Sequence, residues 1–211
     1  MEAPDRTEAP ATAEFPAPDP DYVARLGARR HEPLADGAPP TDADLTTVLR
    51  TALSVPDHGD LTPWRFAVCA GAGRERFARA LVAGLSELRG DDQPQAVVDK
   101  MASKAWAAPC SVVVIASPDP ASNVEVWEQL ASAACTGYAM VLAATGLGYG
   151  AVWKSARVLG TGPVRRLFGC TADESLLGWI NVGRPAPLGR KGVAGRGGGV
   201  DLDARVLRLD G

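Results

Sequence analysis

The segment Val124–Thr145 constrains the fold most, because it has helical character and is apolar on nearly every side. A surface helix of a globular protein normally keeps one polar face, so a helix without one lies in a core or in a subunit interface. Both alternatives remain open for this segment. Its apolar residues are Trp127, Leu130, Ala134, Tyr138, Val141 and Leu142, and small residues at Ala131, Ser132, Ala133 and Gly137 would permit close helix packing.

The rest of the chain alternates between helical and strand-like segments. Cys110–Ala116 is apolar and β-branched, which is typical of a buried central strand. Thr41 and Asp44 resemble a capping box, which predicts a helix that ends at Val55–Pro56. Further helices are predicted at Asp21–Gly27, Arg74–Arg89 and Ala96–Trp106, and from Gly162–Pro163 to near Gly169; further strands at Trp64–Cys69, Gly150–Ser155, Leu176–Val182 and, as an edge strand, Ala204–Leu209. We therefore expect a three-layer α+β fold.

Composition excludes several classes of function. The chain has 211 residues and a net charge of −3, which argues against a general nucleic-acid binder. Only two histidines are present, so a zinc site of several imidazoles is excluded, and we expect no metal site. The four cysteines, Cys69, Cys110, Cys135 and Cys170, lie far apart beside small or apolar residues, which favours buried, reduced thiols. Any chemistry therefore depends on a cofactor.

The first 20 residues differ from the rest. They are dominated by Ala, Pro, Asp and Glu, which predicts a disordered tail at 1–20 followed by one domain at 21–211. The start lacks the apolar core of a signal peptide, and no run approaches the roughly 18 apolar residues that span a bilayer. We expect a cytoplasmic protein without membrane contact.

Three short motifs are candidates for binding chemistry. Arg29-Arg30-His31 follows a short helix and could bind an anion, or could be a solvated basic helix end. The basic pair Arg190-Lys191 lies in a glycine-rich stretch, Leu188–Gly199, and could be a phosphate clamp or an ordinary mobile loop. Trp153-Lys154-Ser155 ends a predicted strand, where ligands often bind, although an interior Trp beside a solvated Lys is equally consistent.

The loop Val55–His58, with Pro63-Trp64 after it, is a further candidate. Its two prolines predict a rigid loop, and its His58 is either a ligand-contacting side chain or a satisfied loop histidine. A nucleophile elbow, a Walker loop and a dinucleotide fingerprint in strand–turn–helix context are absent from the sequence.

Taken in order, these segments resemble the nitroreductase family of flavin enzymes, and most closely its minimal, short-chain branch. The likeness runs from about Tyr22 to Pro185 with little insertion. It is carried by Arg29-Arg30, VLRTALSVPDHGDLTPWRFAVCAGAGRERF (Val48–Phe77), AAPCSVVVIA (Ala107–Ala116), WEQLASAACTGYAMVLAATGLGYGAVWKS (Trp127–Ser155), and the stretch from VRRLFGC to INVGRP (Val164–Pro185).

The resemblance implies a three-layer α-β-α sandwich with a central mixed sheet, assembled as a homodimer with two FMN pockets at the subunit interface. It implies that Arg29, Arg30 and His31 contact the FMN phosphate, with Arg190 or Lys191 completing that site. Ser54 and His58 would be neighbours of the flavin, and Trp153, Lys154 and Ser155 would lie along its isoalloxazine ring. The chain departs from the family at His31, where serine is usual, and at Ser54, where this branch has arginine. Further departures are Thr62, where the family has glutamine, and Ser117, where lysine is expected.

The implied function is an FMN-dependent oxidoreductase. NAD(P)H would reduce the flavin, which would then reduce a nitroaromatic, a quinone or a similar small-molecule acceptor in a ping-pong cycle. Because the flavin carries the hydride chemistry at N5, no catalytic side chain is expected. The alternatives are a flavin-binding homodimer without efficient hydride chemistry, and a specialised family member such as a dehalogenase or dehydrogenase.

Overall fold

A computed structural model describes residues 17–29, 34, 37–186, 201 and 204–209. The chain divides into two compact units, residues 1–29 with 195–211 and residues 30–194. The predicted tail at 1–20 lies largely outside the described residues, so its boundary stays a prediction.

The first unit contains one helix, α1 (Pro20–Ala28), among its described residues. Asp19 caps it, because its carboxylate accepts a hydrogen bond of 2.8 Å from the backbone N–H of Tyr22. Residues 204–209 of this unit begin in a turn and form no strand. The predicted edge strand Ala204–Leu209 is therefore wrong, since alternation gives strand only where a neighbouring strand supplies the hydrogen bonds.

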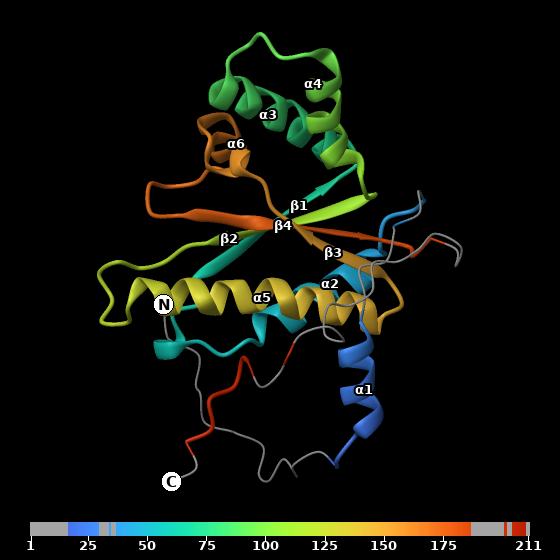
Figure 1. Cartoon of the computed structure of the whole chain (residues 1–211), viewed down its shortest axis with the longest axis vertical. Coiled ribbons are helices and arrows are strands. Elements are labelled where there is room, and N and C mark those ends of the chain that lie inside the picture. Colours follow the sequence, from blue (N-terminus) through green and yellow to red (C-terminus); the bar gives the residue numbers. More distant parts are fainter. Residues whose placement is uncertain (1–16, 30–33, 35–36, 187–200, 202–203, 210–211) are drawn as a thin grey trace, which may run out of the picture. The chain divides into compact units, whose positions relative to one another are not determined.

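The second unit is built on a four-stranded sheet (Figure 1). Its strands are β1 (Trp64–Ala70), β2 (Cys110–Ala116), β3 (Gly150–Lys154) and β4 (Ser175–Gly183), in the spatial order β1-β2-β4-β3. All three pairs of neighbours run antiparallel. The family resemblance implied a mixed sheet, and this is corrected for the described strands, whose backbone hydrogen bonds form three antiparallel ladders.

Helices cover both faces of this sheet (Figure 1). On one face lie α2 (Asp42–Leu53) and α5 (Val126–Gly146); on the other lie α3 (Ala72–Arg89), α4 (Gln95–Ala102) and α6 (Gly162–Leu167). Three short 3₁₀ helices complete the unit: η1 (His58–Asp60), η2 (Ser103–Trp106) and η3 (Arg157–Gly160). The expected α+β class and three layers are confirmed.

Strand β2 is buried along its whole length because both of its faces contact a helical layer. Val112 and Val114 belong to the core beneath α2 and α5, which also contains Met140. Val113 and Ile115 belong to the core beneath α3 and α6. Period-two alternation in a strand that is apolar on both faces except at Ser111 therefore supplies two cores at once.

The start of α2 is fixed as the sequence predicts. The Thr41 hydroxyl accepts a hydrogen bond of 3.1 Å from the Asp44 backbone N–H and donates one of 2.7 Å to the Asp44 carboxylate. The Tyr149 hydroxyl donates to the same carboxylate at 2.7 Å, which connects α2 to the turn before β3. These hydrogen bonds lower the pKa of Asp44.

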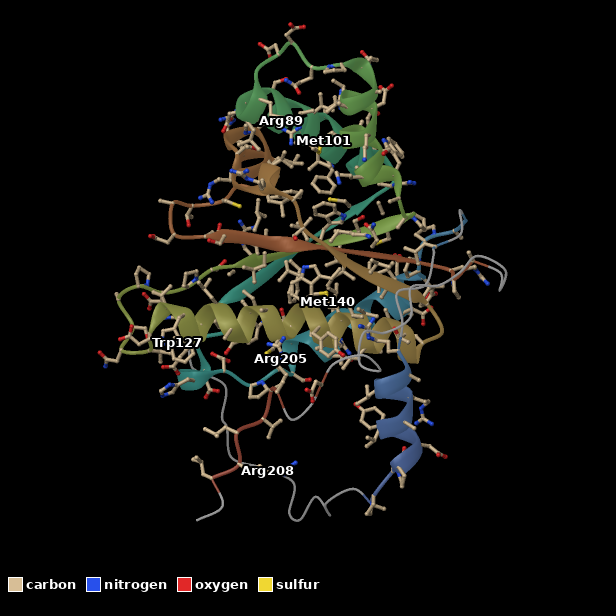
Figure 2. The ribbon with its side chains drawn as sticks, viewed as in Figure 1. Arg89, Met101, Trp127, Met140, Arg205 and Arg208 are labelled. Atoms are coloured by element: carbon tan, nitrogen blue, oxygen red, sulfur yellow. The ribbon has the colours of Figure 1, made fainter. Side chains whose placement is uncertain are left out.

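Helix α5 has one buried side and one exposed side. Met140 is fully buried and lies toward the sheet, whereas Trp127 lies on the opposite side and is 67% exposed (Figure 2). Tyr138 is also exposed. Cys135 is exposed and Cys170 is half-buried, which corrects the expectation that all four cysteines are buried. The apolar character of the outer side of α5 is thus not explained by packing within the described unit.

Candidate functional site

A cleft of about 280 Å³ lies where α4 and η2 face the ends of β3 and β4. Its lining residues are Lys100, Ser103, Lys104, Ala107, Lys154, Ser155, Trp179 and Asn181. We call this cavity the β3 cleft. It contains two of the residues predicted from the sequence, Lys154 and Ser155.

The β3 cleft is strongly cationic. Lys100 and Lys104 lie four residues apart on continuous helical backbone, and Lys154 is the last residue of β3. Among the described residues, none of these three ammonium groups has a carboxylate within ion-pair distance. Three like charges around one cavity, in a chain whose net charge is −3, would favour an anionic or electron-rich ligand there.

Polar groups of β4 reach the same cavity from the sheet. Trp179 and Asn181 are buried, at 1% and 2% exposure. The Asn181 side-chain oxygen accepts a 2.8 Å hydrogen bond from the Ser111 hydroxyl, which fixes the orientation of the amide. The Trp179 indole N–H is buried and has no hydrogen-bond partner among the described residues. An unsatisfied buried donor is costly, and this N–H has no exposed surface toward the cleft, so it is a cost to the fold and not a contact offered to a ligand.

The motif Trp153-Lys154-Ser155 divides between the two sides of the sheet. Trp153 packs against Gly137 of α5, where a Cβ atom would come within 2.5 Å of the indole ring, and it does not line the cleft. Lys154 faces the cleft, as strand alternation predicts. Ser155 also lines the cleft instead of following Trp153, because β3 ends at Lys154 and the alternation ends with it.

The loop that carries His58 is tightly shaped. The Asp57 carboxylate accepts hydrogen bonds from the backbone N–H groups of Leu61 and Thr62, at 2.6 and 3.0 Å. Asp60 and Thr62 both have positive φ, 51° and 47°, which non-glycine residues rarely adopt. Strain of this kind persists only where the surroundings enforce it, and it is commonest at functional sites. The rigidity of this loop stays a prediction.

His58 and Ser54 are not in the β3 cleft. Ser54 caps the end of α2, where its hydroxyl donates a 2.8 Å hydrogen bond to the Thr51 carbonyl. His58 is exposed, and its Nδ1 lies 3.1 Å from Oε2 of Glu128 in α5. Neither residue lines the cleft that contains Lys154 and Ser155. Within one chain, therefore, the structure separates two groups of predicted site residues.

The predicted phosphate site is described only at Arg29. This residue follows α1 as its C-cap and is half-buried. Arg30, His31 and Arg190, together with the alternative Lys191, lie outside the described residues. Their roles stay predictions.

Ser117 serves a structural purpose in this fold. Its hydroxyl donates to the Glu174 carboxylate, which also accepts two hydrogen bonds from Arg65, at 2.6 and 2.7 Å. Glu174 is 7% exposed, and Arg65 holds its pKa at about 2. The position where lysine was expected therefore belongs to a network that connects β1, β2 and the start of β4.

Sequence reasoning missed four polar residues of the cleft: Lys100, Ser103, Lys104 and Asn181. A signal was available for two of them, since Lys100 and Lys104 have the i, i+4 spacing that places both on one side of a helix. Asn181 lies in an apolar strand, where a lone amide requires a partner or a ligand.

The described residues contain no helix that is long and apolar enough to cross a membrane. The fold, a sheet between two helical layers with a polar cleft beside its edge strand, is that of a three-layer α+β protein. The model of the Nitroreductase family matches residues 35–184, and the chain belongs to this family.

Relatives and solved structures agree with this assignment. The chain is 36% identical over 152 residues to YdjA of Escherichia coli (strain K12), which is named as an NAD(P)H nitroreductase; the match covers 72% of this chain and 81% of YdjA. A nitroreductase-like family protein from Bacillus cereus has a TM-score of 0.70 at 20% identity, covering 95% of this chain and 100% of that one. The FMN-dependent nitroreductase NfnB from Mycobacterium smegmatis, solved with NADPH, has a TM-score of 0.63 at 19% identity, covering 86% and 97%.

Proposed function

We propose that this protein is an FMN-dependent oxidoreductase that takes electrons from NAD(P)H and passes them to a nitroaromatic, a quinone or a similar small acceptor. The proposal rests on the β3 cleft in a chain of the nitroreductase family. Three lysines line this cleft, and none has an ion-pair partner among the described residues. One of them, Lys154, and the neighbouring Ser155 were predicted from the sequence. The names of YdjA and NfnB support the choice of cofactor and reductant.

The residues of the cleft fit the carbonyl-bearing edge of a flavin. That edge presents acceptor oxygens and an N–H, and it gains negative charge on reduction. Lys104 and Lys154 would supply positive charge there, and the hydroxyl of Ser155 would supply a hydrogen bond.

When bound, FMN supplies the hydride chemistry. The chain's own residues would hold the ring, favour its charged reduced form through the lysines, and limit water by means of α4 and η2. Arg29, Arg30, His31 and Arg190 would bind the phosphate, whose charge of nearly two units requires several cations.

We further propose that the working unit is a homodimer. A cleft of about 280 Å³ is at the lower limit of ligand pockets, and Ser54 and His58 lie apart from it. A second chain could bring its own Ser54–His58 loop to the cleft. The exposed apolar side of α5, with Trp127 and Tyr138, supports an interface of this kind.

The test is titration of the purified protein with FMN, followed by sedimentation of the mixture. The proposal predicts flavin absorbance that sediments with protein at the mass of two chains. A protein that stays colourless contradicts the cofactor assignment, and bound flavin at the mass of one chain contradicts the dimer.

A further inference from the structure

A second cavity, of about 270 Å³, adjoins the β3 cleft. It lies between the C-terminal end of α3, helix α4 and η3, and we call it the α3–η3 cleft. Its lining residues are Leu85, Leu88, Arg89, Met101, Lys104, Ala156, Arg157 and Val158. Figure 2 labels two of them, Arg89 at the end of α3 and Met101 in α4. Lys104 lines both cavities, and Ser155 of the first is followed directly by Ala156 of the second.

The α3–η3 cleft is lined by three cationic side chains. Among the residues described, Arg89, Arg157 and Lys104 have no ion-pair partner. A cation in the last turn of α3 is favourable toward the helix carbonyls, which could explain Arg89 alone. Arg157 begins η3, a single 3₁₀ turn of four residues, and does not lie at the C-terminal end of a helix, so this explanation does not extend to it. Two guanidinium groups and an ammonium around one cavity form an anion site.

The other walls of this cavity are apolar. Leu85 and Val158 are buried, Met101 is half-buried, and Leu88 is 46% exposed although it is a large aliphatic side chain. A free phosphate or a sugar phosphate would gain nothing from this surface. A ligand with an apolar body and one anionic end would bury the body against the leucines and present the acid to the arginines.

We propose that the α3–η3 cleft binds an aromatic carboxylate and that this ligand is the oxidising substrate. Its acid group contacts Arg89 and Arg157, and its reducible group, a nitro group in the simplest case, lies toward Lys104, which lines both cavities. With NADPH as the electron source, reduction of the nitro group to a nitroso group consumes one NADPH and one proton and releases one NADP⁺ and one water. The assignment to the oxidising substrate rests on the proposed function; the binding of the carboxylate does not. The proposal narrows the class of electron acceptor from any nitroaromatic or quinone to one that carries a carboxylate group.

The experiment compares 4-nitrobenzoate with its neutral isostere 4-nitrobenzamide. Binding of each compound to the protein, with its bound flavin oxidised, is measured by calorimetry. The kcat/KM for each compound is measured with NADPH as reductant. Both are repeated in the Arg89→Gln, Arg157→Gln double variant. The control is Arg79→Gln, because Arg79 is an exposed arginine of α3 whose partner is Glu75 and which lines neither cleft.

The wild-type protein is expected to bind the acid at least about tenfold more tightly than the amide, as charge-assisted contacts typically give. The double variant should lose this preference, whereas Arg79→Gln should keep it. Arg89 and Arg157 are both exposed, so the double variant should fold. A preference that is absent from the wild type, or that survives in the double variant, overturns the proposal.

Two outcomes distinguish this inference from a phosphate site for the nicotinamide cofactor and from the FMN assignment. If the double variant lowers kcat/KM for NADPH while binding of 4-nitrobenzoate is unchanged, the cleft serves the phosphate of the reductant and the proposal is wrong. If the protein binds no FMN but still prefers the acid in calorimetry, the cofactor assignment fails while the anion site stands.

Discussion

The replacement Glu174→Gln tests whether a buried carboxylate stabilises the sheet. Glu174 accepts hydrogen bonds from Arg65, Ser117 and the backbone N–H of Thr171, and it is 7% exposed. Hydrogen bonding to Arg65 is the main reason that its pKa falls from 4.5 to about 2. A difference of this size corresponds to about 3 kcal/mol of stability when the group is ionised.

The sign of the pH dependence follows from the lowered pKa. The stabilisation is fully present above the unfolded pKa of 4.5 and is lost as the pH falls toward the folded value of about 2. Glutamine keeps the shape but not the charge, and it leaves the Arg65 guanidinium without its carboxylate. We therefore expect Glu174→Gln to lower the free energy of unfolding by about 3 kcal/mol at pH 7, or Tm by roughly 6–12 °C.

The assay is urea denaturation of both proteins at several pH values from neutral to about pH 3. The difference between wild type and variant should shrink as the pH falls below 4.5. Glu75→Gln is the control, because Glu75 and its partner Arg79 are exposed and 3.7 Å apart, and we expect a change within about 0.5 kcal/mol. Equal stability of wild type and Glu174→Gln at pH 7, or a difference that does not change with pH, would show that the charge of Glu174 does not stabilise the sheet.

Three further predictions concern packing and the cofactor site. Gly137→Val should destabilise the protein by about 1–3 kcal/mol, because a Cβ at this position would lie 2.5 Å from the Trp153 ring. Gly146→Ala is the control in the same helix, since a Cβ there has no atom within 4 Å, and it should be neutral or stabilising. Thermal denaturation measures both. Lys154→Gln should lower the midpoint potential of bound FMN by about 20 mV, the equivalent of about 1 kcal/mol in a two-electron couple. If its potential equals that of the Arg79→Gln control, Lys154 does not contact the flavin. Arg30→Ala should weaken FMN binding at least about tenfold in a fluorescence titration, since a charge-assisted contact contributes roughly 1.5–3 kcal/mol, and unchanged affinity would show that the phosphate is bound elsewhere.

Much of the fold could be predicted because its signals are local. The Thr41–Asp44 cap and the β-branched run Cys110–Ala116 define α2 and β2 by their own chemistry. Strand direction could not be predicted, because alternation is the same in parallel and antiparallel sheets. The edge strand at Ala204–Leu209 failed for a related reason, since alternation does not supply a partner.

The candidate site was harder to predict than the fold. Lys154 and Ser155 were found because they end a strand, but Lys100 and Lys104 belong to a helix that only the tertiary structure brings to the same cavity. Trp153 belongs to the same motif as Lys154 but does not line the cleft, because its ring packs against Gly137 on the other side of the sheet. The motif itself gave no indication of this. Which side chains share a cavity depends on long-range packing, which the local sequence does not encode.

In the proposed function, the β3 cleft binds part of a flavin that exchanges hydride with NAD(P)H. The most direct test is anaerobic stopped-flow mixing of the FMN-loaded protein with NADPH and, separately, with NADH. We predict rapid bleaching of the flavin absorbance with at least one of them, followed by recovery of the colour when a nitroaromatic acceptor is added. Bound flavin that neither nicotinamide bleaches would contradict the claim and would favour a flavin-binding dimer without hydride chemistry.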